Sequence, residues 1–200
     1  MRDISNSNFG LLISYVVPGF TALWGISYFS PTLATWLNGT NGDGPTVGGF
    51  LYVTIASIAA GMTCSAIRFQ TIDRIHAMTG IPCPTLDFAT LANRTTAYDR
   101  LISNHYNYYK FHANELITLV IVYIARQVTV RDWAGGGEDF AFIVIGVLFF
   151  ATSRDNLQKY HSRAAKLLGT REDIKQPKQH RRRSNRSPHS ILKKVLNRIR

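Results

Sequence analysis

Two ionisable residues, His112 and Glu115, lie one helical turn apart where a polar segment becomes apolar. The stretch NHYNYYKFHANELITLVIVYIA (residues 104–125) begins with histidines, tyrosines and a lysine, and it ends in aliphatic side chains. An ionisable group at membrane depth is costly, so it normally faces a bundle interior or water, where it can relay protons. An ion or proton pathway through His112 and Glu115 is therefore one hypothesis for the function.

A structural role is the favoured interpretation of the same pair. Aromatic side chains within residues 106–111 are typical of the headgroup level, where Lys110 can extend its ammonium group outward to water. Glu115 is then expected to pair with Lys110 or His112, or to cap a neighbouring helix. A metal site in a helical bundle needs ligands from several helices. The other apolar segments supply only Cys64, so neither a metal nor another cofactor is predicted.

A second pattern joins an arginine to a histidine after four or six intervening residues, at Arg100 with His105 and at Arg154 with His161. This Arg-x4–6-His spacing resembles the catalytic motif of HEPN ribonucleases, which pair two helical Arg/His sets across a dimer. The resemblance implies that Arg154 and His161, on a helix after the last apolar segment, would build a phosphate-cleaving site on dimerisation. A membrane-tethered, ribonuclease-like effector is therefore the alternative function.

Small residues recur every four positions in the second apolar segment. Small side chains at this spacing let two helix backbones approach closely in lipid, so we expect this helix to pack inside a bundle. The first stripe is Ser57, Gly61 and Ser65, and the second, beside it, is Ala56, Ala60 and Cys64. Cys64 and the second cysteine, Cys83, have no metal-ligand spacing and are expected to be free thiols.

Four apolar segments are expected to be helices that cross a membrane. A helix of about 20 residues rises about 30 Å, which is the thickness of the hydrocarbon core. Pro18 and Gly19 should bend the first helix, and a bundle tolerates such a bend when a neighbour satisfies the freed carbonyl group. Two spans plus a soluble helical domain is the alternative. The four predicted spans lie near residues 9–29, 47–67, 108–125 and 133–152.

Two further helices are expected outside the spans. Residues 88–116 contain no proline or glycine, and their apolar residues recur at intervals of three, four or seven. This pattern predicts a long helix that begins near residue 88 and leads into the third span. Residues 154–169 form an amphipathic pattern, with Gly169 as its C-terminal stop.

Positive charge is concentrated at the C-terminal end of the chain. Of the 23 Lys and Arg residues, 15 lie from Arg154 onward, where there are only 3 Asp and Glu residues. The loop 30–46 contains no Lys or Arg, whereas the loop 68–107 contains arginines. Because basic loops stay in the cytoplasm, both termini and the central loop are predicted to be cytoplasmic.

Residues 170–200 are expected to be a disordered basic tail that ends in an amphipathic segment. Its cationic side chains would bind anionic lipid, and phosphorylation at Ser184 or Ser187 would weaken that contact. Nucleic-acid binding through the tail is less favoured, because no aromatic residues are interleaved with the basic ones. The predicted lipid-binding residues are Arg181, Arg182, Arg183, Arg186, Lys193, Lys194, Arg198 and Arg200.

These patterns predict an all-α, multi-pass protein of the cell membrane, with about four spans, a cytoplasmic helical extension and a basic tail. The favoured function is not enzymatic. The chain would be a self-associating scaffold, a pore or a partner-binding subunit, and its partners would be anionic lipids and either further copies of itself or another membrane protein. No motif in the sequence names a substrate.

Overall fold

The structure is a computed structural model that describes residues 2–38, 47–130 and 136–170 of the chain. Within these ranges every regular element is helical and there is no strand, which confirms the all-α prediction. The elements are α1 (Arg2–Ser27), α2 (Pro31–Asn38), α3 (Val47–Gln70), α4 (Ile72–Met78), η1 (Phe88–Asn93), α5 (Thr95–Leu101), η2 (Ile102–Tyr106), α6 (Asn107–Val130) and α7 (Gly137–Leu168).

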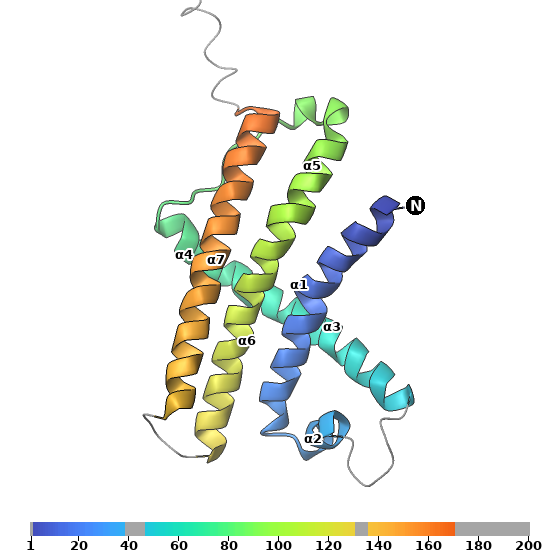
Figure 1. The fold of residues 1–200 in the computed structure, drawn as a ribbon, viewed down its shortest axis with the longest axis vertical. Helices are drawn as coiled ribbons and strands as arrows, with labels where there is room; N and C mark the ends of the chain where they lie inside the picture. The colour runs from blue at the N-terminus through green and yellow to red at the C-terminus, as the bar shows by residue number, and fades with distance from the viewer. Residues whose placement is uncertain (1, 39–46, 131–135, 171–200) are drawn as a thin grey trace, which may run out of the picture.

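Four long helices form the body of the molecule (Figure 1). Helices α6 and α7 lie side by side, α1 packs on the other side of α6, and α3 crosses obliquely behind α1 and α6. The short helices α4, η1 and α5 connect α3 to α6 and cover the upper part of α7.

In the described part of the chain, two helical segments are long and apolar enough to cross a membrane. They are Gly48–Met78, which covers α3 and α4, and Gly137–Leu168, which is α7. Only 17% and 11% of their most apolar stretches are buried, whereas the core helix of a soluble protein is mostly buried. A shorter apolar helix, Leu12–Ser27, lies within α1. The prediction of four spans is therefore not confirmed by length and composition, which support two.

Helices α1 and α3 touch through their backbones. A Cβ atom added to Gly19 would lie 1.7 Å from the carbonyl oxygen of Ser57, and one added to Gly61 would lie 1.9 Å from the carbonyl oxygen of Tyr15. Real Cβ atoms never approach a carbonyl oxygen this closely, so only glycine fits at either position. The absence of two side chains thus sets the distance between the two helices.

Pro18 lies inside α1, and α1 bends in its middle (Figure 1). A proline has no N–H group, so the carbonyl oxygen of Ser14, four residues earlier, loses its helical donor. The side chain of Asn114 on α6 replaces that donor, because its Nδ2 donates to the Ser14 carbonyl oxygen at 2.8 Å. The bend is therefore tolerated in the way that the sequence analysis anticipated.

The predicted fourth span and the predicted amphipathic helix form one continuous helix, α7, of 32 residues. Residues 147–168 contain no proline or glycine, so nothing interrupts the hydrogen-bond ladder between the two parts. Leu157, Ala164 and Leu168 are buried in the second part, and the helix ends at Gly169, whose φ of +80° favours glycine.

The predicted long helix from residue 88 is instead a series of helical segments. The first turns, η1, are a 3-10 helix, α5 follows, and η2 is a π-helix that runs directly into α6. A π-helix adds a residue to the turn and so shifts the side chains that follow it around the axis. The shift matters because η2 carries His105 and Tyr106, which contact α7.

Candidate functional site

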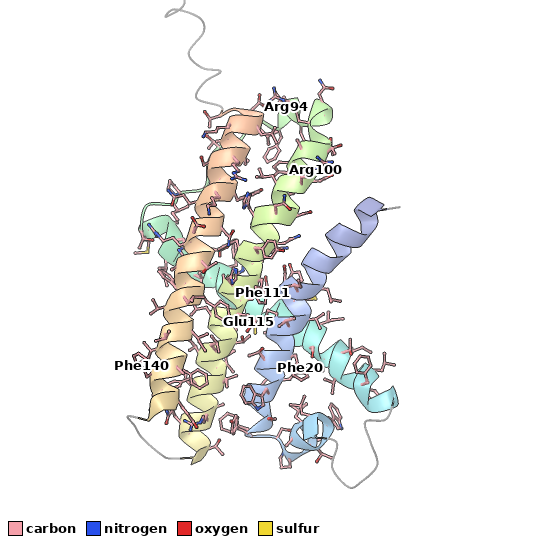
Figure 2. The ribbon with its side chains drawn as sticks, in the orientation of Figure 1. Phe20, Arg94, Arg100, Phe111, Glu115 and Phe140 are labelled. Atoms are coloured by element: carbon pink, nitrogen blue, oxygen red, sulfur yellow. The ribbon has the colours of Figure 1, made fainter. Side chains whose placement is uncertain are left out.

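The charged and apolar side chains divide the bundle into two halves (Figure 2). Arg94 and Arg100 lie at the upper end, whereas Phe20 and Phe140 lie in the lower half. Between them, at mid-height, buried and half-buried polar side chains from several helices gather. We name five of these residues the boundary cluster: Arg68, Asp73, His76, Tyr109 and Lys110.

Arg68, at the end of α3, is held by Asp73 in the first turn of α4. Its Nη1 donates to Oδ1 of Asp73 at 3.0 Å and to Oδ2 at 3.3 Å. The Tyr109 hydroxyl group also donates to Oδ1 of Asp73, and the Arg68 guanidinium lies 5.2 Å from the centre of the Tyr109 ring. Arg68 and Tyr109 are only 5% and 1% exposed, so this triplet ties α3, α4 and α6 together in the interior.

His76 joins α4 to α7 on the other side of Tyr109. Its Nε2 lies 3.1 Å from the Ser153 hydroxyl oxygen, and its ring lies 5.1 Å from the ring of Phe150. His76 and Ser153 are both completely buried. One hydroxyl partner and two aromatic neighbours describe a histidine that is part of the packing between helices.

Lys110 does not extend outward to water as the sequence analysis expected. It is 7% exposed, and its ammonium nitrogen lies 5.1 Å from the Tyr15 ring centre and 5.2 Å from the Tyr106 ring centre. Helix α1 covers this side of α6 and brings Tyr15 over the lysine. Within the described residues Lys110 has no ion pair and no hydrogen bond, so aromatic faces are its contacts.

His112 and Glu115 contact different neighbours in the structure. The His112 ring packs on Phe149 of α7, with 5.5 Å between ring centres. Glu115 is 5% exposed and accepts a hydrogen bond from the Thr118 hydroxyl group at 3.0 Å. Within the described residues neither the Glu115–Lys110 pair nor the Glu115–His112 pair forms, because Lys110 and His112 point to other neighbours.

The four Arg/His candidates lie along α7 and the segments that pack on it. Arg154 donates to the hydroxyl and carbonyl oxygens of Thr79, so it fixes the end of α4 against α7. His105 contacts Arg163, and burial together with this guanidinium lowers the pKa of His105, which favours the neutral imidazole. Each of these contacts holds two helical segments together. Arg100 is exposed at the polar end.

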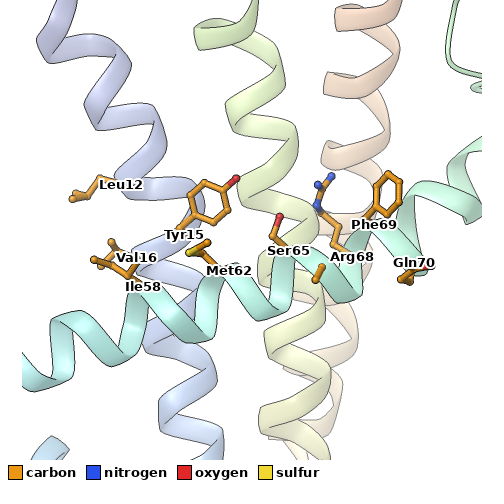
Figure 3. A pocket seen from close by; sticks show the side chains of 10 residues that line it. Leu12, Tyr15, Val16, Ile58, Met62, Ser65, Arg68, Phe69 and Gln70 are labelled. Atoms are coloured by element: carbon orange, nitrogen blue, oxygen red, sulfur yellow. The ribbon is translucent and has the colours of Figure 1, made fainter.

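The small residues of α3 divide between the interior and the surface. Ser57, Gly61 and Cys64 are buried against α1 and α6, whereas Ala56, Ala60 and Ser65 are partly exposed. A groove runs along α1 and α3 beside this contact (Figure 3), with a volume of about 720 Å³. Arg68 of the boundary cluster lines one end of the groove.

The predicted lipid-binding residues and the two cysteines are the remaining predicted site residues. The predicted lipid-binding residues, Arg181 to Arg200, lie outside the described residues. Cys64 and Cys83 are free thiols, as expected. In the part of the chain that is described, there is no group of three His, Cys, Asp or Glu side chains that could hold a metal ion.

Arg68, Asp73, His76 and Asn114 make interior contacts that were not predicted from the sequence. Position was the available signal, because Arg68 directly follows an uncharged stretch of 21 residues and Asn114 lies two residues before the apolar run that begins at Leu116. A polar residue at such a position must find a partner in the bundle. The partner itself could not be read from the sequence, because Asn114 bonds to a residue 100 positions away.

Comparison with known proteins gives no relative. No protein-family model, no curated protein and no solved structure matches the chain. The fold and the boundary cluster therefore define a helical protein with two helices suited to a membrane, and the function is argued from this geometry.

Proposed function

We propose that this chain is an integral membrane protein whose lower half is embedded in lipid and whose upper half lies in the cytoplasm. The observation that supports this is a continuous set of exposed large apolar side chains on α1, α3, α6 and α7, which we name the apolar belt. Its members include Leu12, Val17, Phe20, Trp24, Phe50, Ile55, Met62, Val120, Ile124, Val128, Phe140, Ile143, Val147 and Leu148.

The belt is too large and too exposed for a water-soluble surface. On one face of α7, Phe140, Ile143 and Val147 are 71%, 63% and 63% exposed. A soluble monomer rarely exposes a contiguous apolar patch of more than a few hundred Å². In the described part of α7 beyond Leu148, no large apolar side chain is exposed, so the belt ends near the boundary cluster.

The belt fits a bilayer in height and in the charges at its two edges. From Gly137 to Ser153, α7 rises about 25 Å, close to the roughly 30 Å of the hydrocarbon core. The Arg126–Glu138 ion pair and the hydrogen bond from Gln127 to Asp139, at 2.9 Å, lie at the lower edge. The boundary cluster lies at the upper edge, where the headgroups would be.

In this arrangement α1, α3, α6 and α7 make four crossings, of which α3 is the most oblique. The N-terminal end of α1 and the C-terminal end of α7 both point toward the polar half (Figure 1), as an even number of crossings requires. The basic C-terminal region then follows α7 into the cytoplasm, in agreement with the positive-inside rule.

Within the membrane, the chain acts as a scaffold or partner-binding subunit. The charged groups of the boundary cluster are mostly engaged by neighbours inside the fold, such as Arg68 by Asp73 and His76 by Ser153. The first half of α3, in contrast, extends beyond the other helices and exposes Phe50 and Ile55. A second copy or another membrane helix can pack on that face, and the basic tail can bind anionic lipid.

Cysteine labelling in native membranes tests this proposal. In a background with Cys64→Ala and Cys83→Ser, the variant Ile143→Cys places a thiol in the belt and Lys166→Cys places one in the polar half. A membrane-impermeant maleimide should label Lys166→Cys in inverted vesicles, where the cytoplasmic face is outside, and should not label it in right-side-out vesicles. It should label Ile143→Cys only after detergent is added.

Two results would contradict the proposal. One is equal labelling of Ile143→Cys and Lys166→Cys before detergent is added. The other is wild-type protein that stays in solution, monodisperse, after extraction without detergent.

A further inference from the structure

The groove between α1 and α3 has apolar walls and a polar end (Figure 3). Leu12 and Val16 of α1 and Ile58 and Met62 of α3 form the walls. Its volume of about 720 Å³ lies in the range of sites that hold small molecules, 300–1,000 Å³. Leu12 and Met62 are 54% and 62% exposed, so the groove opens sideways onto the apolar belt.

Positive charge gathers at the polar end of this groove. Arg68 lines that end, and Tyr15 lies beside Met62 with its hydroxyl group turned toward the side of Arg68 (Figure 3). The Nε–H group of Arg68 is buried and has no hydrogen-bond partner, although Asp73 accepts from Nη1. Lys110 does not line the groove, but its ammonium nitrogen lies 5.1 Å from the ring centre of Tyr15, which does, and it has no carboxylate partner among the described residues. Asp73 alone therefore does not neutralise the two cations.

We propose that the groove binds one anionic phospholipid of the surrounding bilayer. One acyl chain lies along Leu12, Val16, Ile58 and Met62, and the phosphate lies near Arg68 and Lys110. A phosphate oxygen supplies the missing acceptor for Arg68 Nε–H and compensates the charge of Lys110.

Charge favours an anionic lipid in the groove over a second copy of the chain and over the C-terminal segment of the chain itself. A second copy would bring the apolar face of α3, which carries no carboxylate to meet the two cations. The terminal segment ILKKVLNRIR has an apolar face but adds four further cations. An anionic lipid combines an apolar chain with a negative charge at one end, as the groove combines apolar walls with a positive end.

The inference rests on the proposed function, because the lipid reaches the groove from a bilayer. The test uses the full-length protein in phosphatidylcholine vesicles that contain a trace of photoreactive phospholipid, with a diazirine in the middle of one acyl chain. The headgroup of the probe is phosphatidylglycerol in one sample and phosphatidylcholine in the other. Mass spectrometry then measures labelling of the groove peptides around Leu12 and Met62, relative to labelling of the belt around Ile143.

The basic tail would enrich anionic lipid around the whole belt. Dividing groove labelling by belt labelling removes this general enrichment and leaves the preference of the groove itself. After this normalisation, the anionic probe should label the groove about fivefold more than the neutral probe, the ratio expected for about one nearby basic residue. Lys110→Gln should bring the ratio close to one, whereas the matched variant Lys166→Gln on the surface of α7 should leave it unchanged.

A second pair of variants tests the space in the groove. Ser65 lines the groove, so Ser65→Phe should reduce groove labelling by both probes, whereas Thr63→Phe, on the exposed side of the same helix, should not. Equal normalised labelling by the two probes would overturn the inference, as would an unchanged ratio in Lys110→Gln. Absence of groove labelling by either probe would overturn it in favour of a second copy or the tail.

Alkaline extraction of the same vesicles separates the two proposals. If the protein resists extraction but shows no headgroup preference, the lipid site is refuted and the proposed membrane location is still supported. Protein that is released by alkali would refute both.

Discussion

At the residue scale, the fold depends on a small number of polar contacts inside an apolar bundle. Asn114 is completely buried, and its side chain donates to the carbonyl oxygen of Ser14, which Pro18 leaves without a helical donor. The Ser14 hydroxyl group, also buried, lies 3.0 Å from the carbonyl oxygen of Asn107 and so adds a second link between α1 and α6. In lipid, an unsatisfied backbone carbonyl group is costly, so these contacts have consequences that can be measured.

We therefore expect Asn114→Leu to lower the free energy of unfolding by about 1–2 kcal/mol, the range for hydrogen bonds between membrane helices. The reason is specific: the Ser14 carbonyl oxygen loses its donor. Pro18→Ala restores a backbone N–H group at position 18, so Asn114→Leu should cost much less in that background. Thermal or denaturant unfolding in detergent of the four members of this double-mutant cycle measures the difference. Equal cost in both backgrounds would show that Asn114 does not act through the Ser14 carbonyl oxygen.

At the element scale, the crossing of α1 and α3 is set by glycine. Gly19 and Gly61 leave space for a carbonyl oxygen of the opposite helix, and Gly25 lies against the backbone of α6 at Val122. Small residues let helices approach in this way and gain dispersion contacts along their length. The element that these contacts position is the second half of α3, which delivers Arg68 to the boundary cluster.

Gly61→Ala should destabilise the protein by about 1–3 kcal/mol, because its methyl group would overlap the Tyr15 carbonyl oxygen and force α1 and α3 apart. Gly146→Ala on α7 is the matched control. Its added methyl group would lie 3.8 Å from a side-chain carbon of Leu116, which is an ordinary contact. There alanine should be neutral or stabilise the helix by up to about 1 kcal/mol. Thermal unfolding in detergent distinguishes the two, and similar melting temperatures for both variants would contradict the close approach of the backbones.

The sequence predicted the elements better than their contacts. The apolar segments, the bend at Pro18 and the stop at Gly169 follow from local rules on composition, proline and glycine. The break of the 88–116 helix into η1, α5 and η2 does not, because no residue in it forbids a regular helix. The π-helix arises where η2 must fit α1, α5 and α7 at once, which is a tertiary requirement.

The boundary cluster shows the same limit for the site. Arg68, His76 and Tyr109 meet because α4 continues from the end of α3 past α6 to α7 (Figure 1), and no local feature of the sequence indicates which residues of α6 and α7 it will contact. Lys110 was expected at the lipid surface because it lies among aromatic residues. It is buried because Tyr15, from a distant helix, covers it.

At the scale of the whole molecule, the described helices leave one side of α3 without a neighbour. Its first half projects from the bundle (Figure 1), with Leu51 and Ile55 57% and 56% exposed. Lipid alone can cover such a face, but a second helix would cover it with closer contacts. The proposed role as a self-associating subunit depends on which of the two is present.

Disulfide crosslinking in native membranes tests self-association. In the background without Cys64 and Cys83, Ile55→Cys should give a crosslinked dimer on mild oxidation, because the α3 faces of two copies would meet there. Ile143→Cys, equally exposed on α7, is the control and should remain monomeric. Dimers of Ile143→Cys at the same yield would indicate random collision, and a monomeric Ile55→Cys would place the partner surface elsewhere.

The uninterrupted course of α7 has a mechanical consequence. Its 32 residues make a rod about 48 Å long that passes from the apolar half of the bundle into the polar half without a joint. A rod of this kind cannot absorb a rotation at one end. Any load applied near Leu168 must therefore reappear, as tilt, at Gly137, the other end of the helix.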